Sequence, residues 1–351
     1  MSETAFRSQS WRQRLLLGGT VLFFGMLLFC PDKTTPAVSE GMTVFTKKLV
    51  PVLFPYMVLS HFFCTYKLLD PLAELLPIGH LFRMDTCAFT VFVLGHLCGY
   101  PVGAKMTAES VHSGNLSPRQ GAVLCAASGG ASPAFLLHIV GGMLWGDIRL
   151  GMLLFGCQVV FGLAAGWLLG RPIKSNPVKP KVSSDPVPLS RCFCEAVSGS
   201  ALQLVSVGGY IVFFTLLTAL LPFGGTAGAS LAAVLEFSTG VRISASLGGY
   251  RGLFLTGFAV GFGGLSVLAQ TAHMLSGSGV SLRIYAGCKI CAGFFCGLAA
   301  VCYGLVFPDF SLCRNVTAGP APVGCGTDLV WFTLVLGIMW YFSMTHRAAE
   351  Q

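Results

Sequence analysis

Long apolar segments separated by short polar stretches occupy most of the chain. Ten of them stand out, at roughly 15–30, 43–66, 84–113, 119–144, 150–170, 197–222, 227–247, 252–277, 284–307 and 328–344. A helix needs about 20 apolar residues to cross the ~30 Å hydrocarbon core of a bilayer, and most of these segments approach or exceed that length. The pattern predicts an all-α polytopic membrane protein.

The first apolar segment, 15–30, follows Arg12 and Arg14, as in a secretory signal sequence. Because the small-residue cleavage site after it is poor, we predict a retained N-terminal transmembrane helix. With the loop after it, this helix makes up the region 1–42.

A polar linker at 171–196 divides the chain. Its first part holds five prolines and five basic residues, namely Pro172, Pro177, Pro180, Pro186 and Pro188, and Arg171, Lys174, Lys179, Lys181 and Arg191. Such a composition predicts an extended segment with no core of its own. The linker separates a first repeat, 43–170, from a second, 197–307, and residues 308–351 add a loop and a last transmembrane helix.

The two repeats carry matching short motifs. The first has Gly103-Ala104-Lys105 and then Gly129-Gly130-Ala131-Ser132; the second has Gly240-Val241-Arg242 and then Gly263-Gly264-Leu265-Ser266. The order of the motifs, their separation and their positions within the segments are alike. The match indicates an internal duplication.

Glycine, proline and serine interrupt four of the apolar segments. Gly99, Pro101 and Gly103 divide 84–113, and Ser238-Thr239-Gly240 divides 227–247. The resulting arms of about 10–15 residues would be roughly 15–22 Å long, half the thickness of the hydrocarbon core. We therefore expect two re-entrant helical hairpins.

The other two interruptions lie in segments 119–144 and 252–277. These segments are expected to be broken transmembrane helices, unwound at Ser128-Gly129-Gly130 and at Gly263-Gly264. Irregular backbone at membrane depth persists only where protein or a water-filled cavity covers it. We expect the four irregular regions to meet, and such a meeting point is the best sequence indication of a transporter site.

Charge supports the hairpin topology. The chain has 22 Lys and Arg against 14 Asp and Glu, a net charge of +8, and cytoplasmic loops collect Lys and Arg. Ten crossings would place the basic linker outside the cell. Eight crossings plus two hairpins place the linker and both termini in the cytoplasm and the loop 308–327 outside, and they make the two repeats inverted.

Composition excludes several classes of protein. Hydrophobic residues make up 54% of the chain and charged residues 10%, which is too little polar surface for a soluble enzyme, a nucleic-acid-binding module or a secreted disulfide scaffold. The 44 glycines fit close helix contacts in lipid. The expected surroundings are a lipid bilayer, with no nucleic acid partner.

The motifs in and around the interruptions resemble those of a known family. The strings that carry the resemblance are Gly95-His96-Leu97-Cys98-Gly99-Tyr100-Pro101-Val102-Gly103-Ala104-Lys105, Leu235-Glu236-Phe237-Ser238-Thr239-Gly240 and Phe262-Gly263-Gly264-Leu265-Ser266-Val267. They are similar to the sporulation integral membrane proteins with nucleoside-recognition, or Gate, domains. That group is related to concentrative nucleoside transporters and to the gate of ferrous iron transporters. The resemblance covers roughly 43–307.

The resemblance implies a fold and a function. The fold is that of an inverted-repeat transporter, like the concentrative nucleoside transporters. The function, for the sporulation branch, is movement of dipicolinic acid from the mother cell across the outer forespore membrane. Two alternatives are a nucleoside or other neutral-solute transporter of the same superfamily and a non-transporting sporulation scaffold.

Lys105 and Arg242 are the first candidates for substrate binding, because each lies two residues past a tip glycine. Two cations at matching positions suit a small dianion with two carboxylates, such as dipicolinate. The alternative is internal ion pairing, of Lys105 with Glu109 and of Arg242 with Glu236. Glu236 is also a candidate carrier of a coupling proton.

Neutral groups around the unwound backbone complete the expected site. Candidates for hydrogen bonds to substrate are Ser128, Ser132, Ser238, Thr239, Ser266 and Gln270, and Tyr100 is a candidate for stacking on a planar ring. The glycines at the tips and breaks, namely Gly99, Gly103, Gly129, Gly130, Gly240, Gly263 and Gly264, together with Pro101, shape the backbone. Lys289, early in its segment, is expected to extend to the cytoplasmic surface.

No motif predicts catalysis or a cofactor. The sequence contains no nucleophile elbow, zinc-protease motif or phosphate-binding loop, so no enzyme activity and no ATP-driven pumping are expected. His96 and His138 suggest no metal set, and an iron role for Cys98 and Cys125 is a minor alternative. Cys313 and Cys325 share a loop in which they could form a disulfide. A homo-oligomer is compatible with this plan.

Overall fold

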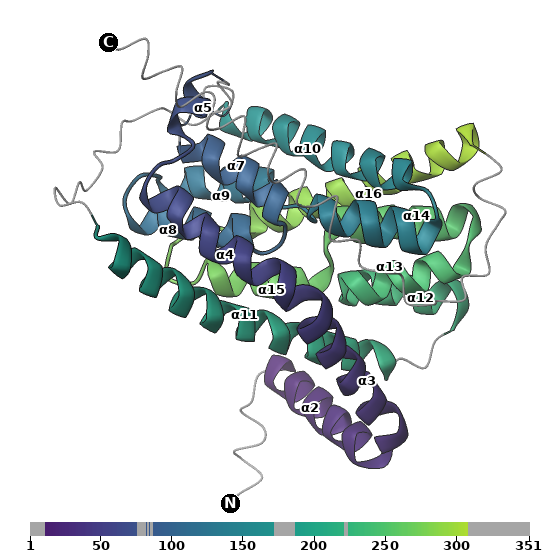
Figure 1. Cartoon of the computed structure of the whole chain (residues 1–351). Helices are drawn as coiled ribbons and strands as arrows, with labels where there is room; N and C mark the ends of the chain where they lie inside the picture. The colour runs from purple at the N-terminus through teal and green to yellow at the C-terminus, as the bar shows by residue number, and fades with distance from the viewer. Residues whose placement is uncertain are drawn as a thin grey trace, which may run out of the picture.

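The computed structural model of the protein describes residues 11–75, 82, 84, 87–171, 187–220 and 224–307, and these contain helices and no strand (Figure 1). The all-α prediction is therefore confirmed for this part of the chain. Its first half forms α2 (Trp11–Phe29), α3 (Pro31–Thr43), the π-helix η1 (Val44–Leu49), α4 (Val50–Thr65), α5 (Asp70–Leu75), α7 (Cys87–Cys98), α8 (Val102–His112), α9 (Pro118–Ser128), the π-helix η2 (Phe135–Trp145) and α10 (Ile148–Gly170).

The second half has a similar order of elements. It forms α11 (Leu189–Ala219), α12 (Gly225–Leu235), α13 (Phe237–Leu247), α14 (Gly249–Phe262), α15 (Gly264–Met274) and α16 (Leu282–Val306). Apart from α2 and α5, each half contains a long helical run, two pairs of short helices and a final long helix. This order matches the segment plan read from the sequence.

Two helices begin earlier than expected. The helix expected from about residue 43 begins at Pro31 and continues through α3, η1 and α4 to Thr65. Pro31 lies in the first turn, where proline lacks only an N–H that has no partner within the helix. Likewise, α11 begins at Leu189, inside the expected linker, of which 172–186 lies outside the described residues.

The interruption in 84–113 produces two short helices that fold back on each other. α7 and α8 have 12 and 11 residues, and a Cβ on Gly95 would lie 3.2 Å from the Cα of Gly103 across the tip. Gly99 has a φ of 79°, a left-handed conformation that favours glycine, and the peptide bond between Tyr100 and Pro101 is cis. The predicted break and arm lengths are confirmed.

The second pair of short helices breaks two residues earlier than predicted. α12 ends at Leu235 and α13 begins at Phe237, so Ser238-Thr239-Gly240 is already in the first turn of α13. The arms have 11 residues each, and a Cβ on Gly240 would lie 2.5 Å from the Cα of Ala233. The break moves because Glu236, rather than the glycine, begins the new helix.

The two broken helices are interrupted where the sequence predicts. α9 ends at Ser128 and η2 begins at Phe135, with Gly129 in extended backbone after Ser128. α14 and α15 are separated only by Gly263, and both Gly263 and Gly264 have positive φ, 83° and 78°. Glycine adopts this conformation without the steric cost that other residues incur.

Four helices among the described residues are long and apolar enough to cross a membrane: Ile148–Gly170, Leu189–Ala219, Gly249–Met274 and Leu282–Val306. A fifth span is formed if Leu16–Phe29 and Pro31–Lys47, which meet at 97°, are one bent span. The expected spans 43–66 and 119–144 do not meet the same criterion, because η1 and the break at Gly129 divide them into shorter helices. The expected span 328–344 lies outside the described residues.

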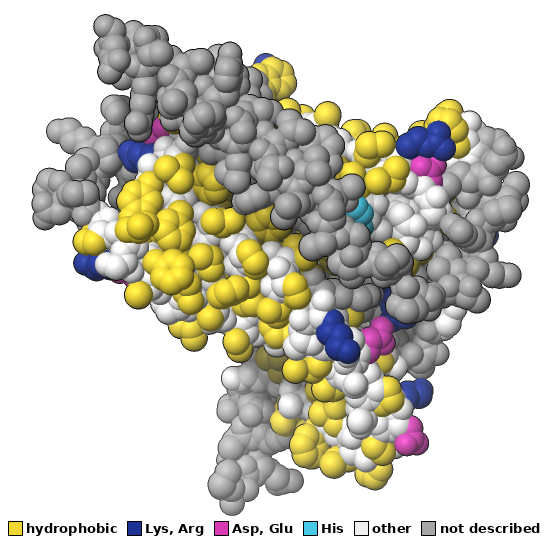
Figure 2. Space-filling model, viewed as in Figure 1, with side chains coloured by type: hydrophobic (Ala, Val, Ile, Leu, Met, Phe, Trp, Pro, Cys, Tyr) yellow, Lys and Arg dark blue, Asp and Glu magenta, His cyan; other side chains and the backbone are white. Residues whose placement is uncertain are grey.

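The long helices present apolar side chains outward. Large hydrophobic residues are exposed on all four of them, for example Val160 on α10, Leu202 on α11, Leu265 on α15 and Leu298 on α16. Figure 2 shows a broad hydrophobic area where α4 and α11 lie side by side. Such surfaces on a large helical bundle are typical of contact with lipid.

Two of the three hydrophobic clusters among the described residues fill most of the interior. One joins α4, α7, α8, α9 and α11, and the other joins η2, α10, α12, α13, α14 and α16. α14 and α16 approach very closely: a Cβ on Gly257 would lie 2.4 Å from the Cys296 carbonyl oxygen, and one on Gly261 2.3 Å from that of Ala292. Glycine thus permits close helix contact, as its abundance predicts.

Candidate substrate site

The two hairpin tips and the two helix breaks meet at Tyr100. The Tyr100 ring lies 6.1 Å from the ring of Phe237, the first residue of α13. A Cβ on Gly263, in the second break, would lie 3.3 Å from the Tyr100 Cζ. A Cβ on Gly99 would lie 2.7 Å from the backbone nitrogen of Ser132, in the first break. These contacts confirm the predicted meeting of the four irregular regions.

Lys289 of α16 joins this centre and is only 2% exposed. Its Nζ donates a hydrogen bond to the Tyr100 hydroxyl and another, of 3.1 Å, to the carbonyl oxygen of Gly129. It also lies 4.8 Å from the centre of the Tyr100 ring. The prediction that Lys289 extends to the membrane surface is therefore wrong, because its position two turns into α16 places it against the first hairpin tip.

The charge of Lys289 is not balanced by a carboxylate in the part of the chain that the structure describes. Among the described residues, no carboxylate lies within 4.0 Å of its Nζ. Its two hydrogen-bond acceptors are neutral, and an ammonium group has three N–H donors. One N–H donor of the ammonium group therefore remains for a further acceptor.

A small pocket lies beside these contacts. Its cavity volume is about 10 Å³, about the room that one water molecule needs, and it is lined by Gly99, Tyr100, Pro101, Gly103, Ala104, Cys125, Ser128, Gly129, Gly130, Thr271 and Tyr285. These residues belong to the first hairpin, α9 and the first break, α15 and α16. Both hydrogen-bond partners of Lys289 are among them.

Three hydroxyl groups in this lining have no hydrogen-bond partner among the described residues: Ser128, Thr271 and Tyr285. All three side chains are at most 2% exposed. The Thr271 and Tyr285 hydroxyls are neighbours, but no hydrogen bond of normal geometry joins them. Buried polar groups are usually paired, so three unpaired hydroxyls in one pocket indicate a site for a polar ligand or water.

Glycines hold the first hairpin against the first break. A Cβ on Gly95 would lie 2.5 Å from the Ser128 carbonyl oxygen, and one on Gly103 would lie 2.9 Å from the Ser128 Oγ. With Gly99 against Ser132, glycines at every fourth position face the break. Any side chain on this face would separate the hairpin from the pocket wall.

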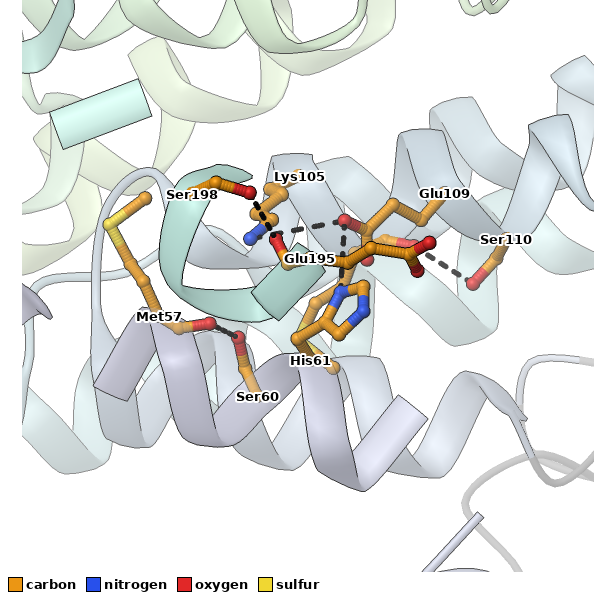
Figure 3. Close-up of polar contacts among 9 residues, drawn as sticks. Met57, Ser60, His61, Lys105, Glu109, Ser110, Glu195 and Ser198 are labelled. Atoms are coloured by element: carbon orange, nitrogen blue, oxygen red, sulfur yellow. Dashed lines mark hydrogen bonds and ion pairs between the residues drawn. The ribbon is translucent and has the colours of Figure 1, made fainter. Parts of the chain in front are cut away.

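Lys105 is buried on α8 but does not line the pocket. Its Nζ lies 3.9 Å from Glu109 Oε1, and the Nδ1 of His61, on α4, lies 4.0 Å from the same oxygen. Figure 3 shows both nitrogens directed at this oxygen, and the Glu109 side chain is 37% exposed. The Lys105–Glu109 ion pair, the predicted alternative to substrate binding, is confirmed.

Arg242 also lies away from the pocket, at the surface. Its side chain is 52% exposed, and its guanidinium group forms an ion pair of 2.5 Å with Glu40 of α3. The predicted pairing with Glu236 is wrong, because the Glu236 carboxylate caps α13. It accepts hydrogen bonds from the backbone N–H groups of Ser238 and Thr239, at 3.1 and 2.7 Å, and from the Ser238 hydroxyl.

The neutral residues of the expected site have different surroundings. Tyr100 and Ser128 line the pocket. Ser132 accepts a hydrogen bond from a backbone N–H at the start of η2. The hydroxyl of Ser266 accepts a hydrogen bond of 3.1 Å from Gln270, and both side chains are buried in α15 outside the pocket lining.

No group of His, Cys, Asp and Glu side chains among the described residues could hold a metal ion. Cys98 and Cys125 are buried free thiols, and the Nδ1 of His96 is 2.9 Å from a backbone carbonyl oxygen. The proposed disulfide between Cys313 and Cys325 lies outside the described residues.

Sequence reasoning missed Lys289, Thr271 and Tyr285 as residues of this centre. All three lie on α15 and α16, outside the repeated motifs. A charged residue within an apolar span is an indication of function by default, and that rule applied to Lys289 would have found it. Thr271 and Tyr285 give no comparable signal in the sequence.

Comparison with known proteins gives one informative match. The chain is 22% identical over 327 residues to the sporulation integral membrane protein YlbJ of Bacillus subtilis, and the match covers 80% of each chain. No family model matches the chain. No solved structure matches it. With the four apolar helices, the match identifies the chain as a multi-pass integral membrane protein.

Proposed function

We propose that the protein transports a small anionic metabolite across the membrane, through the pocket beside Tyr100. One observation carries the proposal: Lys289, a buried cation with no carboxylate partner among the described residues, lies where a hairpin tip and a helix break border a pocket. A charge within a bilayer costs at least about 2.5–3.5 kcal/mol, so it normally has a partner or faces water. An anionic substrate would supply that partner.

The assignment of the binding cation differs from the one that the repeated motifs favour. Lys105 and Arg242 each have a carboxylate partner and neither lines the pocket. Lys289 is the described cation beside the pocket that lacks such a partner. The proposal therefore depends on Lys289 and treats Lys105 and Arg242 as structural residues.

The mechanism that we propose is alternating access by two inverted repeats. The similar order of elements in the two halves and the short hairpin arms support this scheme. Hairpins and broken helices at corresponding positions mark the substrate site in many secondary transporters. In this scheme the linker and both termini are cytoplasmic, and one hairpin-bearing bundle moves against the rest.

The substrate that we propose is dipicolinate, carried across the outer forespore membrane during sporulation. The likeness to a sporulation integral membrane protein supports the biological setting. The resemblance of the hairpin and break motifs to the sporulation branch of the Gate-domain proteins supports the substrate. Dipicolinate is a small dianion, which suits a pocket next to an unpaired ammonium group.

Counterflow tests the proposal directly. Purified protein in liposomes loaded with unlabelled dipicolinate should accumulate labelled dipicolinate from outside, and protein-free liposomes should not. Absence of exchange by correctly inserted protein would rule out dipicolinate transport.

A second candidate function is transport of a neutral, nucleoside-like solute. The observation that favours it is the set of three unpaired hydroxyls, since hydroxyls bind neutral polar groups as well as anions. Uridine counterflow that dipicolinate does not inhibit would select this alternative.

A further inference from the structure

We propose that the pocket beside Tyr100 binds a single water molecule through the hydroxyls of Ser128, Thr271 and Tyr285, and that this water joins the two halves of the chain in a closed conformation. Such a bridge goes beyond the proposed function, because it needs no transported solute.

The pocket has the size of one water molecule. Its cavity volume is about 10 Å³, close to the smallest volume that holds a water. Pockets that hold drug-sized ligands are about 300–1,000 Å³, so the described conformation is closed to such a solute. A buried water also needs two to four polar partners, and the three hydroxyls of the lining meet that need.

The three hydroxyls differ from other buried hydroxyls of these helices. Thr107 and Ser110 of α8 each donate a hydrogen bond of 2.8 Å to the backbone carbonyl oxygen four residues earlier. Ser128 and Thr271 also lie on helices, yet neither hydroxyl has such a partner among the described residues, and the hydroxyl of Tyr285 has none either. Buried polar groups are usually bonded to protein or to ordered water, so water is the partner that fits here.

The three hydroxyls come from both halves of the chain. Ser128 ends α9, next to the first break, whereas Thr271 lies on α15 and Tyr285 on α16. A Cβ on Gly129 would lie 3.0 Å from the Tyr285 ring and 3.4 Å from its hydroxyl oxygen, so glycine lets α16 pack against the break. One water held by all three hydroxyls therefore bridges surfaces that separate if one bundle moves against the other.

The charges around the pocket favour water over a cation. Lys289 donates hydrogen bonds to Tyr100 and Gly129, two residues of the lining, so its positive charge lies behind the pocket wall. The described residues that line the pocket include no acidic side chain. A small neutral molecule that both donates and accepts matches three hydroxyls, since each of them can also do both.

Thermal unfolding of the purified full-length protein in detergent tests the bridge. Ser128→Ala, Thr271→Val and Tyr285→Phe should each lower Tm by about 1–4 °C, because each removes one hydrogen bond to the water. Ser244→Ala is the matched control for Ser128→Ala, since the Ser244 hydroxyl is equally buried and has no partner among the described residues, but Ser244 does not line the pocket. It should leave Tm unchanged or raise it, because it removes an unsatisfied polar group.

A double variant tests whether one water is shared. Ser128 and Thr271 lie on different halves of the chain, and no hydrogen bond joins their side chains. Ser128→Ala combined with Thr271→Val should therefore lower Tm by less than the sum of the two single shifts, since both act on the same water. An experimental map at about 2 Å should show an ordered peak within about 3.2 Å of all three hydroxyl oxygens.

Cys125 reports whether the water holds the pocket closed. It lines the pocket and is 1% exposed. Tyr285→Phe should raise the rate at which N-ethylmaleimide modifies Cys125 by about 2- to 10-fold, measured by mass spectrometry of its peptide, because the bridge is weakened. Cys192, buried on α11 outside the pocket lining, reports global unfolding and should keep its rate.

The water bridge is overturned by an unchanged or higher Tm in Thr271→Val and Tyr285→Phe, by additive shifts in the double variant, or by equal losses in Ser244→Ala and Ser128→Ala. Equal modification of Cys125 in the wild type and Tyr285→Phe would overturn its role in closure. None of these measurements uses a solute. Failure of dipicolinate counterflow would therefore remove the proposed transport and leave this site intact.

Discussion

The two hairpins carry a basic residue at matching positions, but the surroundings of the two residues are opposite. Lys105 is 4% exposed and lies 3.9 Å from a carboxylate on its own helix. Arg242 is 52% exposed and pairs with Glu40, a residue of the N-terminal helical run. The repeated motif therefore does not determine what the charged residue contacts.

The hairpin tips differ in the same way. At the first tip, glycine and proline expose Tyr100 to Lys289 and the pocket. At the second tip, the Glu236 carboxylate is used by backbone and side-chain donors of α13. We infer that the first tip provides most of the binding surface, whereas the second tip supports it through the contact of Phe237 with Tyr100.

The largest expected effect of a substitution is at the first tip. Gly99→Ala should destabilise the protein by about 3 kcal/mol or more, because a Cβ there combines a positive φ with a contact of 2.7 Å to Ser132. Thermal unfolding in detergent measures it. Gly114→Ala is the matched control, because Gly114 has a φ of 78° with open space around its Cβ. Gly114→Ala should lower the free energy of unfolding by only about 1–2 kcal/mol. Equal losses in the two variants would show that the packing argument is wrong.

Removing the acidic partner of each basic residue compares how much the two ion pairs stabilise the protein. Glu109→Ala should lower the free energy of unfolding by about 2–3 kcal/mol, because it leaves the buried Lys105 charge unpaired. The loss is smaller than for a fully buried pair, since Glu109 is partly exposed. Glu40→Ala should cost less than about 1 kcal/mol, because that pair is exposed to solvent. The measurement is unfolding of both variants at the same detergent and salt concentrations. Similar losses of stability in the two variants would contradict the prediction.

The cap at the second tip gives a smaller effect. Glu236→Ala should cost about 2 kcal/mol, since it removes the acceptor for the first N–H groups of α13. Glu236→Gln keeps an amide oxygen as acceptor and should recover most of the loss. If the glutamine variant kept its stability but lost transport, the carboxylate would have a role beyond capping.

The smallest effect is expected at the surface cation. Arg242→Gln should leave the rate of dipicolinate counterflow within about twofold of the wild-type rate and stability within about 1 kcal/mol, because it breaks only an exposed ion pair. Complete loss of transport in a folded Arg242→Gln protein would restore Arg242 as a binding residue.

The sequence predicts the backbone plan well because glycine and proline act locally. The breaks at Gly99-Tyr100-Pro101, at Gly129 and at Gly263 follow from restrictions on φ and from missing donors, which need no tertiary information. The expected second tip lies two residues later than the observed break, because the cap formed by Glu236 is a side-chain hydrogen bond, which the positions of glycine and proline do not report.

The binding residues are harder to predict because they depend on tertiary contacts. Arg242 pairs with a residue 202 positions away, and Lys289 meets a tyrosine 189 positions away, so no local pattern reports either contact. Lys105 shows the contrast. Its partner is four residues along the same helix, and the spacing gives that pair as the alternative to substrate binding.

We propose that an anion crosses the membrane by way of Lys289. The most direct test is counterflow of labelled dipicolinate in liposomes, with wild-type, Lys289→Met and Arg242→Gln proteins inserted in equal amounts. We predict rapid exchange by the wild type and by Arg242→Gln, and exchange at least about 10-fold slower by Lys289→Met. Equal rates for the wild type and Lys289→Met, or no exchange by any of the three, would contradict the claim.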